Sequence, residues 1–306
     1  MNVHHTPVMV QEILTALHIK PDGSYIDCTI GEGGHSHAII GAEQGVHLLG
    51  IDMDVQALDV AEQRLKEHSD RLTLVQGNFA DVELIAKDHE FGPVDGILMD
   101  LGISSLQVET QDRGFSFRLE ARLDMRMDSQ RRVTAFTVVN GYSEGDLANI
   151  IYQLGEEPRS RRVARAIVRN RPIETTTRLA DVVKKTLGQS RKSRIHPATR
   201  TFQAIRIAVN GELENLEQGL GRVLELLKVG GRIAVISYHS LEDRLVKSTF
   251  RREASVCICP PEMPQCVCDH QPIIKLVNRR VLRPTPEEVR ANPRSRSARL
   301  RVAERI

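Results

Sequence analysis

Apolar positions follow two spacings along the first hundred residues. Short apolar runs predict buried strands at residues 24–28, 47–52, 72–76 and 94–100. Between the second and third runs, apolar side chains recur at helical spacing, at Val55, Leu58, Ala61 and Leu65. Strands that alternate with helices of this length predict right-handed βαβ units and a parallel sheet.

The pattern changes after residue 100. Residues 101–133 are polar and carry Gly and Arg, which is typical of a long loop or lid. Helical signals then follow one another without strands, beginning near Ser143, Pro158, Arg178 and Pro197. This stretch predicts a helical domain inserted into the α/β domain.

The strand and helix signals resume near residue 213. A helix over 213–227 precedes a strand at 233–237 and a helix over 241–252. Two further apolar runs, 273–277 and 298–302, are expected to form a closing antiparallel pair. We therefore expect a discontinuous α/β domain of residues 1–105 and 206–306, with a lid and helical substrate-recognition domain at 106–205.

Composition places the chain among ordinary globular proteins. The 306 residues are 41% hydrophobic and 27% charged, which argues against disorder, collagen and coiled coil. No apolar stretch approaches the roughly 18 residues of a membrane span, and the start lacks a secretory pattern. With an odd five cysteines as well, we expect a reduced, cytoplasmic protein.

The small net charge conceals a division along the chain. Residues 1–100 hold 5 Lys and Arg against 17 Asp and Glu, whereas the remainder holds 37 against 23. Arginine, whose planar fork suits phosphate contacts and base stacking, outnumbers lysine 33 to 9. Solvated helices with local ion pairs would explain the same counts. The asymmetry nonetheless favours a nucleic-acid partner.

A glycine-rich segment directly follows the first predicted strand. It runs Asp-Cys-Thr-Ile-Gly-Glu-Gly-Gly-His over residues 27–35. Glycines here let the backbone turn tightly and approach a ligand, and Asp52, at the end of the next strand, is placed to accept hydrogen bonds from ribose hydroxyls. The two features predict a nucleoside-cofactor site. The alternative is a plain βα turn with an incidental Asp.

The glycine spacing bears on which cofactor binds. Dinucleotide sites leave two residues between the second and third glycines, whereas Gly33 and Gly34 are adjacent. The order Asp-x-x-x-Gly-x-Gly-Gly instead resembles the S-adenosylmethionine loop of Rossmann-like methyltransferases. After the third strand, Asn78 and Phe79 stand where such enzymes hold the adenine ring, although Phe79 could equally be a core residue.

Asp100 ends the fourth predicted strand, so we expect it to face the ligand. A carboxylate there could accept a hydrogen bond from a base amino group and localise its lone pair for methyl transfer, or it could only bind the cofactor. The Asn/Asp-Pro-Pro-Tyr/Phe motif of DNA amino-methyltransferases is absent. Near the same rim, His239 could relay a proton and Tyr238 could stack on a base, or Ser240 could simply cap a helix.

Four cysteines cluster in sequence as two close pairs, Cys257 with Cys259 and Cys266 with Cys268. Zinc pairs usually leave two or more residues between their ligands. The single-residue spacing therefore favours a reduced loop without metal. Cys28, on the first strand, is expected to be a small buried hydrophobe.

Basic clusters occur in the inserted region, around Arg161 and Arg162 and over residues 191–194. Contact with an RNA backbone and ion pairing between helices are both compatible with them.

Taken together, these motifs resemble a known family. The chain is similar to the bacterial small-subunit ribosomal RNA methyltransferase H, or MraW, family over nearly its whole length. The segments that carry the resemblance are 5–9, 31–36, 99–105, 113–117, 123–128, 155–158, 202–207 and 237–244.

The resemblance implies a fold, an activity and a set of site residues. The implied fold is a mostly parallel, seven-stranded Rossmann-like sheet with an inserted helical domain. The implied activity is S-adenosylmethionine-dependent methylation of the exocyclic N4 of a cytidine in the 16S rRNA decoding centre, on the small ribosomal subunit. Matching positions assign cofactor contacts to Gly33, Gly34, His35, Asp52, Phe79, Asp100 and Gln107. The candidate catalytic residues are the three placed at the rim above, Asp100, Tyr238 and His239.

The resemblance also sets limits and leaves alternatives. No shared catalytic metal and no membrane are expected, and a homodimer is compatible with the sequence. The segment Glu120-Ala121-Arg122 departs from the proline-containing approach expected before Leu123. A dinucleotide-dependent oxidoreductase and a ribosome-assembly factor without catalysis remain the alternatives.

Overall fold

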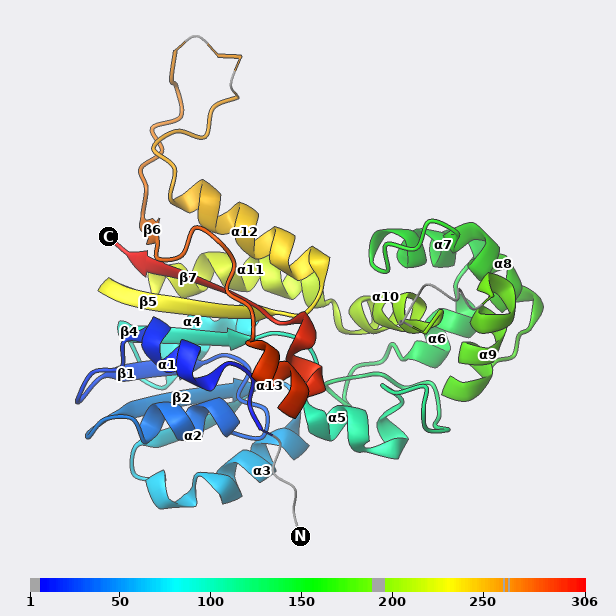
Figure 1. Ribbon diagram of the computed structural model, residues 1–306, viewed down its shortest axis with the longest axis horizontal. Helices are drawn as coiled ribbons and strands as arrows, with labels where there is room; N and C mark the ends of the chain where they lie inside the picture. Colours follow the sequence, from blue (N-terminus) through cyan, green and yellow to red (C-terminus); the bar gives the residue numbers. More distant parts are fainter. Residues whose placement is uncertain (1–5, 189–195, 261, 264) are drawn as a thin grey trace. The chain divides into compact units, whose positions relative to one another are not determined.

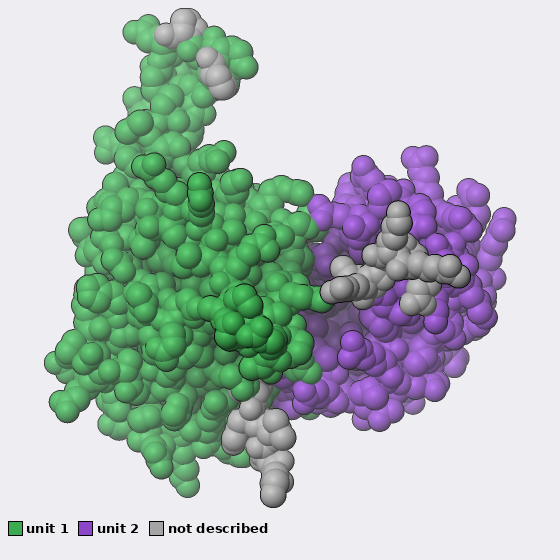
Figure 2. Space-filling model, in the orientation of Figure 1, with its two compact units in different colours: residues 1–102, 214–306 green, residues 103–213 purple. Residues whose placement is uncertain are grey.

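The chain forms two compact units. The computed structural model describes residues 6–188, 196–260, 262–263 and 265–306. One unit combines residues 1–102 with 214–306, and the other is 103–213 (Figure 2). The divisions differ from the expected 105/106 and 205/206, because α5 begins at Ser105 and α10 continues to Asn210, past the expected boundary.

A seven-stranded sheet forms the centre of the first unit (Figure 1), in the order β3-β2-β1-β4-β5-β7-β6. The strands from β1 to β5 pair in parallel, and β7 pairs antiparallel with both β5 and β6. The strands are β1 Ser24–Asp27, β2 His47–Asp52, β3 Leu72–Gln76, β4 Val94–Asp100, β5 Leu227–Ser237, β6 Ile274–Leu276 and β7 Arg299–Arg305. The expected Rossmann-like sheet and its closing antiparallel pair are confirmed.

Helices cover both faces of this sheet. Apolar residues of α1, α2 and α3 join one buried cluster, and those of α4, α11 and α12 join another. The helices are α1 Val10–Leu17, α2 Gly34–Ile40, α3 Val55–Arg64, α4 Val82–Asp88, α11 Glu212–Glu225, α12 Ser240–Glu253 and α13 Pro286–Ala291. Burial on both faces explains why the central strands are nearly continuous apolar runs.

The second unit is helical. It contains α5 Ser105–Glu109, α6 Ala135–Gly141, α7 Glu144–Gln153, α8 Ser160–Arg169, α9 Thr176–Leu187 and α10 Thr199–Asn210. The segment predicted as a loop before α6 contains the short helix α5. It is held against α10 by Asn210, whose side chain donates to the Met125 carbonyl and accepts from the Met127 N–H, each at 2.8 Å. At the unexpected Glu120-Ala121-Arg122 segment, the Ala121 carbonyl accepts from the Thr176 N–H at 2.9 Å. The described part of the chain has no helix long and apolar enough to cross a membrane.

Candidate functional site

The glycine-rich segment turns sharply between β1 and α2. Gly31 and Gly33 have φ of 51° and 75°, values that favour glycine. A Cβ on Gly33 would lie 3.1 Å from Leu65 Cδ1, and one on Gly34 would lie 3.2 Å from Pro7. The positive φ values therefore favour glycine at Gly31 and Gly33, and a side chain at Gly34 would require Pro7 to shift by a few tenths of an ångström.

Asp52 closes the next strand and is tied to this loop. Its carboxylate accepts from the Gly31 N–H and from the Asp54 N–H, both at 2.9 Å. Burial raises the pKa of Asp52 to about 6. A carboxylate has about four lone-pair directions, so the two backbone bonds leave acceptor capacity for ribose hydroxyls.

Asp27, at the end of β1, is a third acid that the sequence analysis quoted within its motif but did not assign to the site. Its carboxylate accepts from Ser36 Oγ at 2.6 Å and from the Thr29 N–H at 3.1 Å. Burial raises its pKa to about 6. An acid at the end of a strand, immediately before a glycine-rich turn, was the available signal.

Asp100 ends β4 beside the same loop. Its N–H donates to Thr29 Oγ1 at 2.6 Å, and the Tyr238 hydroxyl donates to its Oδ1 at 2.9 Å. Burial raises the pKa of Asp100 to about 7, with Glu242 adding to the effect. The side chain keeps 23% exposure, so a ligand can reach it.

His35 lies on the other side of this carboxyl group. Its Nδ1 is 3.5 Å from Asp100 Oδ2, and its Nε2 is 2.8 Å from the Val8 carbonyl oxygen. A carbonyl oxygen only accepts hydrogen bonds, so Nε2 carries the hydrogen. Burial lowers the pKa of His35, which favours the neutral form of the ring. The neutral ring therefore supplies no positive charge to Asp100.

The strands thus bring three acids to one edge of the sheet. Asp27, Asp52 and Asp100 end β1, β2 and β4, which are adjacent in the sheet. Hydrogen bonds join all three to the glycine-rich segment: the Thr29 N–H donates to Asp27, the Gly31 N–H donates to Asp52, and Thr29 Oγ1 accepts from the Asp100 N–H. The pKa of each of the three acids is raised, chiefly because loss of solvent around the carboxyl group disfavours its ionised form. The arrangement favours a cationic ligand.

Tyr238 and His239 follow β5 and occupy roles that differ from the simplest expectations. The partly buried Tyr238 directs its hydroxyl to Asp100. His239, rather than the expected Ser240, is the N-cap of α12: its Nδ1 accepts from the Glu242 N–H, while Glu242 accepts from the His239 N–H. His239 has the extended backbone typical of an N-cap residue, whereas Ser240 is already the first residue of the helix.

Phe79 and Gln107 belong to different units. Phe79 opens the short 3₁₀ turn Phe79–Asp81 and packs so closely on α11 that a Cβ on Gly219 would lie 2.8 Å from its ring. Gln107 lies in the second unit, where it completes a capping box with Ser104 at the start of α5. Both positions have a structural role, and their cofactor contacts remain predictions.

Exposed arginines gather on α8 of the second unit. Arg161, Arg162 and Arg169 are exposed, and among the described residues their guanidinium groups have no ion-pair or hydrogen-bond partner. Arg165, by contrast, lies 3.3 Å from Glu144. The other predicted basic cluster, at 191–194, lies outside the described residues. Unpaired arginines of this kind are free to contact phosphate.

The chain is similar over nearly its whole length to one family model and to several named proteins. A family model described as the MraW methylase family matches residues 2–306. A relative from Dehalococcoides mccartyi, named Ribosomal RNA small subunit methyltransferase H, is 53% identical over 99% of this chain and 86% of its own. Relatives of the same name from Thermomicrobium roseum and Symbiobacterium thermophilum are 50% and 48% identical, each over 100% of this chain and over 95% and 98% of their own.

Proposed function

The chain belongs to the MraW methylase family, and on that premise we propose that it methylates the exocyclic N4 of a cytidine in the decoding centre of 16S rRNA. It is an S-adenosylmethionine-dependent methyltransferase. The name shared by its relatives, Ribosomal RNA small subunit methyltransferase H, supports small-subunit rRNA as the substrate class. The choice of N4 and of the decoding centre is the finer part of the proposal.

The acids and glycines suit this cofactor. Asp52 has acceptor capacity for the ribose hydroxyls, while Gly33 and Gly34 would let the cofactor approach the backbone. Three acids with raised pKa values, one buried and two partly buried, would be stabilised in their ionised form by the positive sulfonium group. His35, Phe79 and Gln107 complete the proposed set of cofactor contacts. When bound, the cofactor supplies an electrophilic methyl group.

The observation that carries the proposal is the setting of Asp100. A cytosine amino group is a poor nucleophile because its lone pair is delocalised into the ring. The Asp100 carboxylate, in its ionised form, would accept a hydrogen bond from this N–H and localise the lone pair. Tyr238 holds the carboxylate through Oδ1, which leaves Oδ2 to face the amine.

The amine loses one proton as the new N–C bond forms. An Asp100 carboxyl group with a pKa raised to about 7 is suited to accept that proton near neutral pH. The proton would then leave Asp100 for solvent, with His239 as the proposed relay, while Tyr238 would position the carboxyl group that accepts it. On the RNA side, the unpaired arginines of α8 would contact backbone phosphates.

A transfer assay tests this function. Small subunits from cells that lack this protein are incubated with the purified chain and isotope-labelled S-adenosylmethionine, and the rRNA is digested for mass spectrometry. The proposal predicts label at one N4-methylcytidine. Label on another atom or nucleotide would refute the finer assignment, whereas binding of the cofactor without any transfer would favour a non-catalytic assembly factor.

A further inference from the structure

The segment between α12 and β6 projects away from the sheet of its own unit (Figure 1). Between residues 254 and 273, its described part contains no helix or strand. Its apolar side chains are mostly exposed: Val256 is 78% exposed and Val267 is 68% exposed. Hydrophobic burial therefore does little to hold this segment in one conformation, and another kind of interaction is needed.

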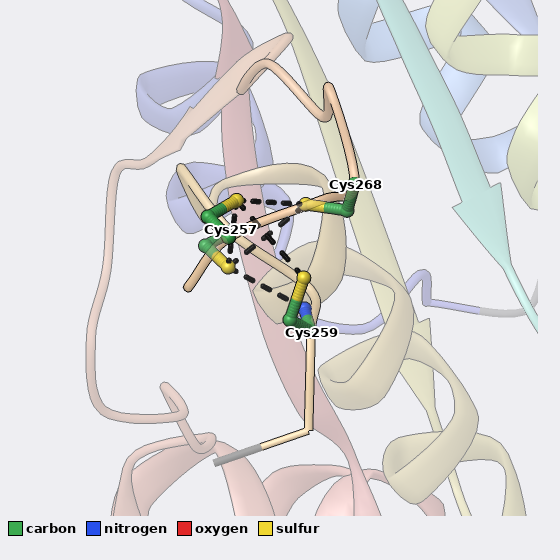
Figure 3. Close-up of side chains that lie close together, drawn as sticks. Cys257, Cys259 and Cys268 are labelled. Atoms are coloured by element: carbon green, nitrogen blue, oxygen red, sulfur yellow. Dashed lines mark hydrogen bonds between the residues drawn. The ribbon is translucent and has the colours of Figure 1, made fainter. Parts of the chain in front are cut away.

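The four clustered cysteines meet within this segment (Figure 3), with their sulfur atoms mutually within 4.8 Å. The Sγ atoms of Cys257 and Cys266 are 3.5 Å apart, those of Cys266 and Cys268 3.6 Å, those of Cys268 and Cys257 3.9 Å, and those of Cys259 and Cys266 4.0 Å. Four sulfurs placed tetrahedrally around zinc at about 2.3 Å lie about 3.8 Å from one another. The observed distances scatter around that value.

Backbone N–H groups point at these sulfurs. The Ile258 N–H donates to Cys268 Sγ at 3.5 Å, and the Val267 N–H donates to Cys259 Sγ at 3.4 Å. Each of these donors is the residue between the two cysteines of one pair, and it bonds to a sulfur of the other pair. Such donors stabilise thiolates rather than thiols, because hydrogen bonds to the charged form favour it.

The distances exclude a disulfide arrangement. A disulfide holds its sulfurs at about 2.05 Å, and the Sγ contacts here are 3.5 Å or longer. Four neutral thiols at an exposed position would gain little from meeting, since they are weak donors and weak acceptors. A bound cation accounts for the approach of all four.

We propose that Cys257, Cys259, Cys266 and Cys268 bind one Zn²⁺ ion as four thiolates. This reverses the expectation of a metal-free loop. The single-residue spacing within each pair is accommodated because the intervening N–H bonds across to the other pair. Soft thiolate ligands in a tetrahedral arrangement select zinc over magnesium, calcium or manganese.

The site is structural rather than catalytic. All four positions are filled by protein sulfurs, which leaves no open position for water or substrate. The cysteines follow the carboxyl end of α12, and His239 caps the amino end. The 14 residues of this helix span about 21 Å, which separates the cysteines from His239. The ion would join the two halves of the projecting segment and fix its exposed apolar side chains in place.

Metal analysis of the purified full-length chain tests the proposal. The protein is prepared in reducing buffer without chelator, and its zinc is measured by inductively coupled plasma mass spectrometry. One zinc per chain is expected, with near-complete loss in the double variant Cys259→Ser/Cys266→Ser. Val267→Ser, which alters an exposed neighbour but keeps the thiols and the backbone N–H, is the matched control and should retain the metal.

Cobalt substitution gives a second readout that does not depend on activity. Co²⁺ added to the metal-free full-length chain should produce the intense visible bands of a tetrahedral four-thiolate site, and Zn²⁺ should displace them. Circular dichroism checks that the serine variant keeps its fold. A metal-free wild-type chain that also gives no cobalt spectrum, iron in place of zinc, or zinc retained by the serine variant would each overturn the proposal.

Discussion

The two units differ in the sign and the solvent exposure of the charged side chains at their proposed functional surfaces. In the first, one acid at the end of a parallel strand, Asp27, is buried, two others, Asp52 and Asp100, are partly buried, and all three have raised pKa values. In the second, the side chains of three arginines on α8, Arg161, Arg162 and Arg169, are exposed and unpaired among the described residues. Buried charge is unscreened and acts over short distances, whereas exposed charge is weak, screened and dependent on salt.

This contrast suggests a division of work. A buried acid can change the reactivity of one atom, because each unit of pKa shift corresponds to about 1.4 kcal/mol. Exposed arginines can hold a long polyanion at many points without altering its chemistry. We therefore expect substitutions in the first unit to change catalysis and those on α8 to change RNA affinity.

The largest effect is expected from Asp100→Asn. The amide still accepts the Tyr238 hydrogen bond, but it cannot take a proton, so kcat should fall about 10²–10⁴-fold. Thermal stability should hold or rise above neutral pH, because a carboxylate that burial disfavours has been removed. Single-turnover methyl transfer and calorimetry measure the two quantities.

Asp95→Asn, at the other end of the same strand, is the control. Lys228 Nζ is 2.7 Å from Asp95, and hydrogen bonding holds the pKa of this acid below its usual value against the effect of its burial. Its loss should reduce stability and leave methyl transfer almost intact. The account fails if both variants lose activity in proportion to stability.

A smaller effect is expected on α8. Reversing Arg161 and Arg162 to Glu should weaken binding of small-subunit rRNA about tenfold and make its dependence on salt less steep. Affinity for S-adenosylmethionine should not change. Filter binding over a salt series measures the first effect, and calorimetry the second.

Arg279→Glu/Arg280→Glu is the matched control, since it reverses two adjacent exposed arginines of the first unit. An equal loss of RNA affinity in both double variants would show that only overall charge matters, contrary to the proposed role of α8.

The contrast between the units also predicts a pH dependence of stability. The pKa values of Asp27 and Asp52 are about 6 and that of Asp100 about 7 when folded, against 3.8 unfolded. The folded chain binds protons that the unfolded chain has released, so stability without cofactor should fall as pH rises from about 4 to about 7. S-adenosylmethionine should reduce this fall. Melting temperatures measured with and without it at several pH values check both statements, and a rise over this range would contradict them.

The sequence predicted the sheet well because its strands are distinct apolar runs, and parallel strands place their carboxyl ends together. Asp52 and Asp100 follow directly from that rule. The three-dimensional arrangement of the thiols did not follow, since their spacing within the chain conceals hydrogen bonds made between the pairs. The cap at His239 was missed because histidine is not among the favoured capping residues.

The boundary of the inserted region was also difficult to predict. Helix α10 continues to Asn210, whose amide side chain holds residues of a loop more than 80 positions earlier in the chain. Helical periodicity gives no sign of such a long-range contact, so a boundary drawn at 205/206 divides a continuous helix.

The central claim is that Asp100 acts as a buried negative charge toward a positive methyl donor. Calorimetry at about pH 8, where the carboxyl group is ionised, gives the affinities for S-adenosylmethionine and for its uncharged thioether product, S-adenosylhomocysteine. The account predicts that Asp100→Asn lowers the preference for the charged form about tenfold, while Asp95→Asn leaves it unchanged. An unaltered preference in Asp100→Asn would contradict it.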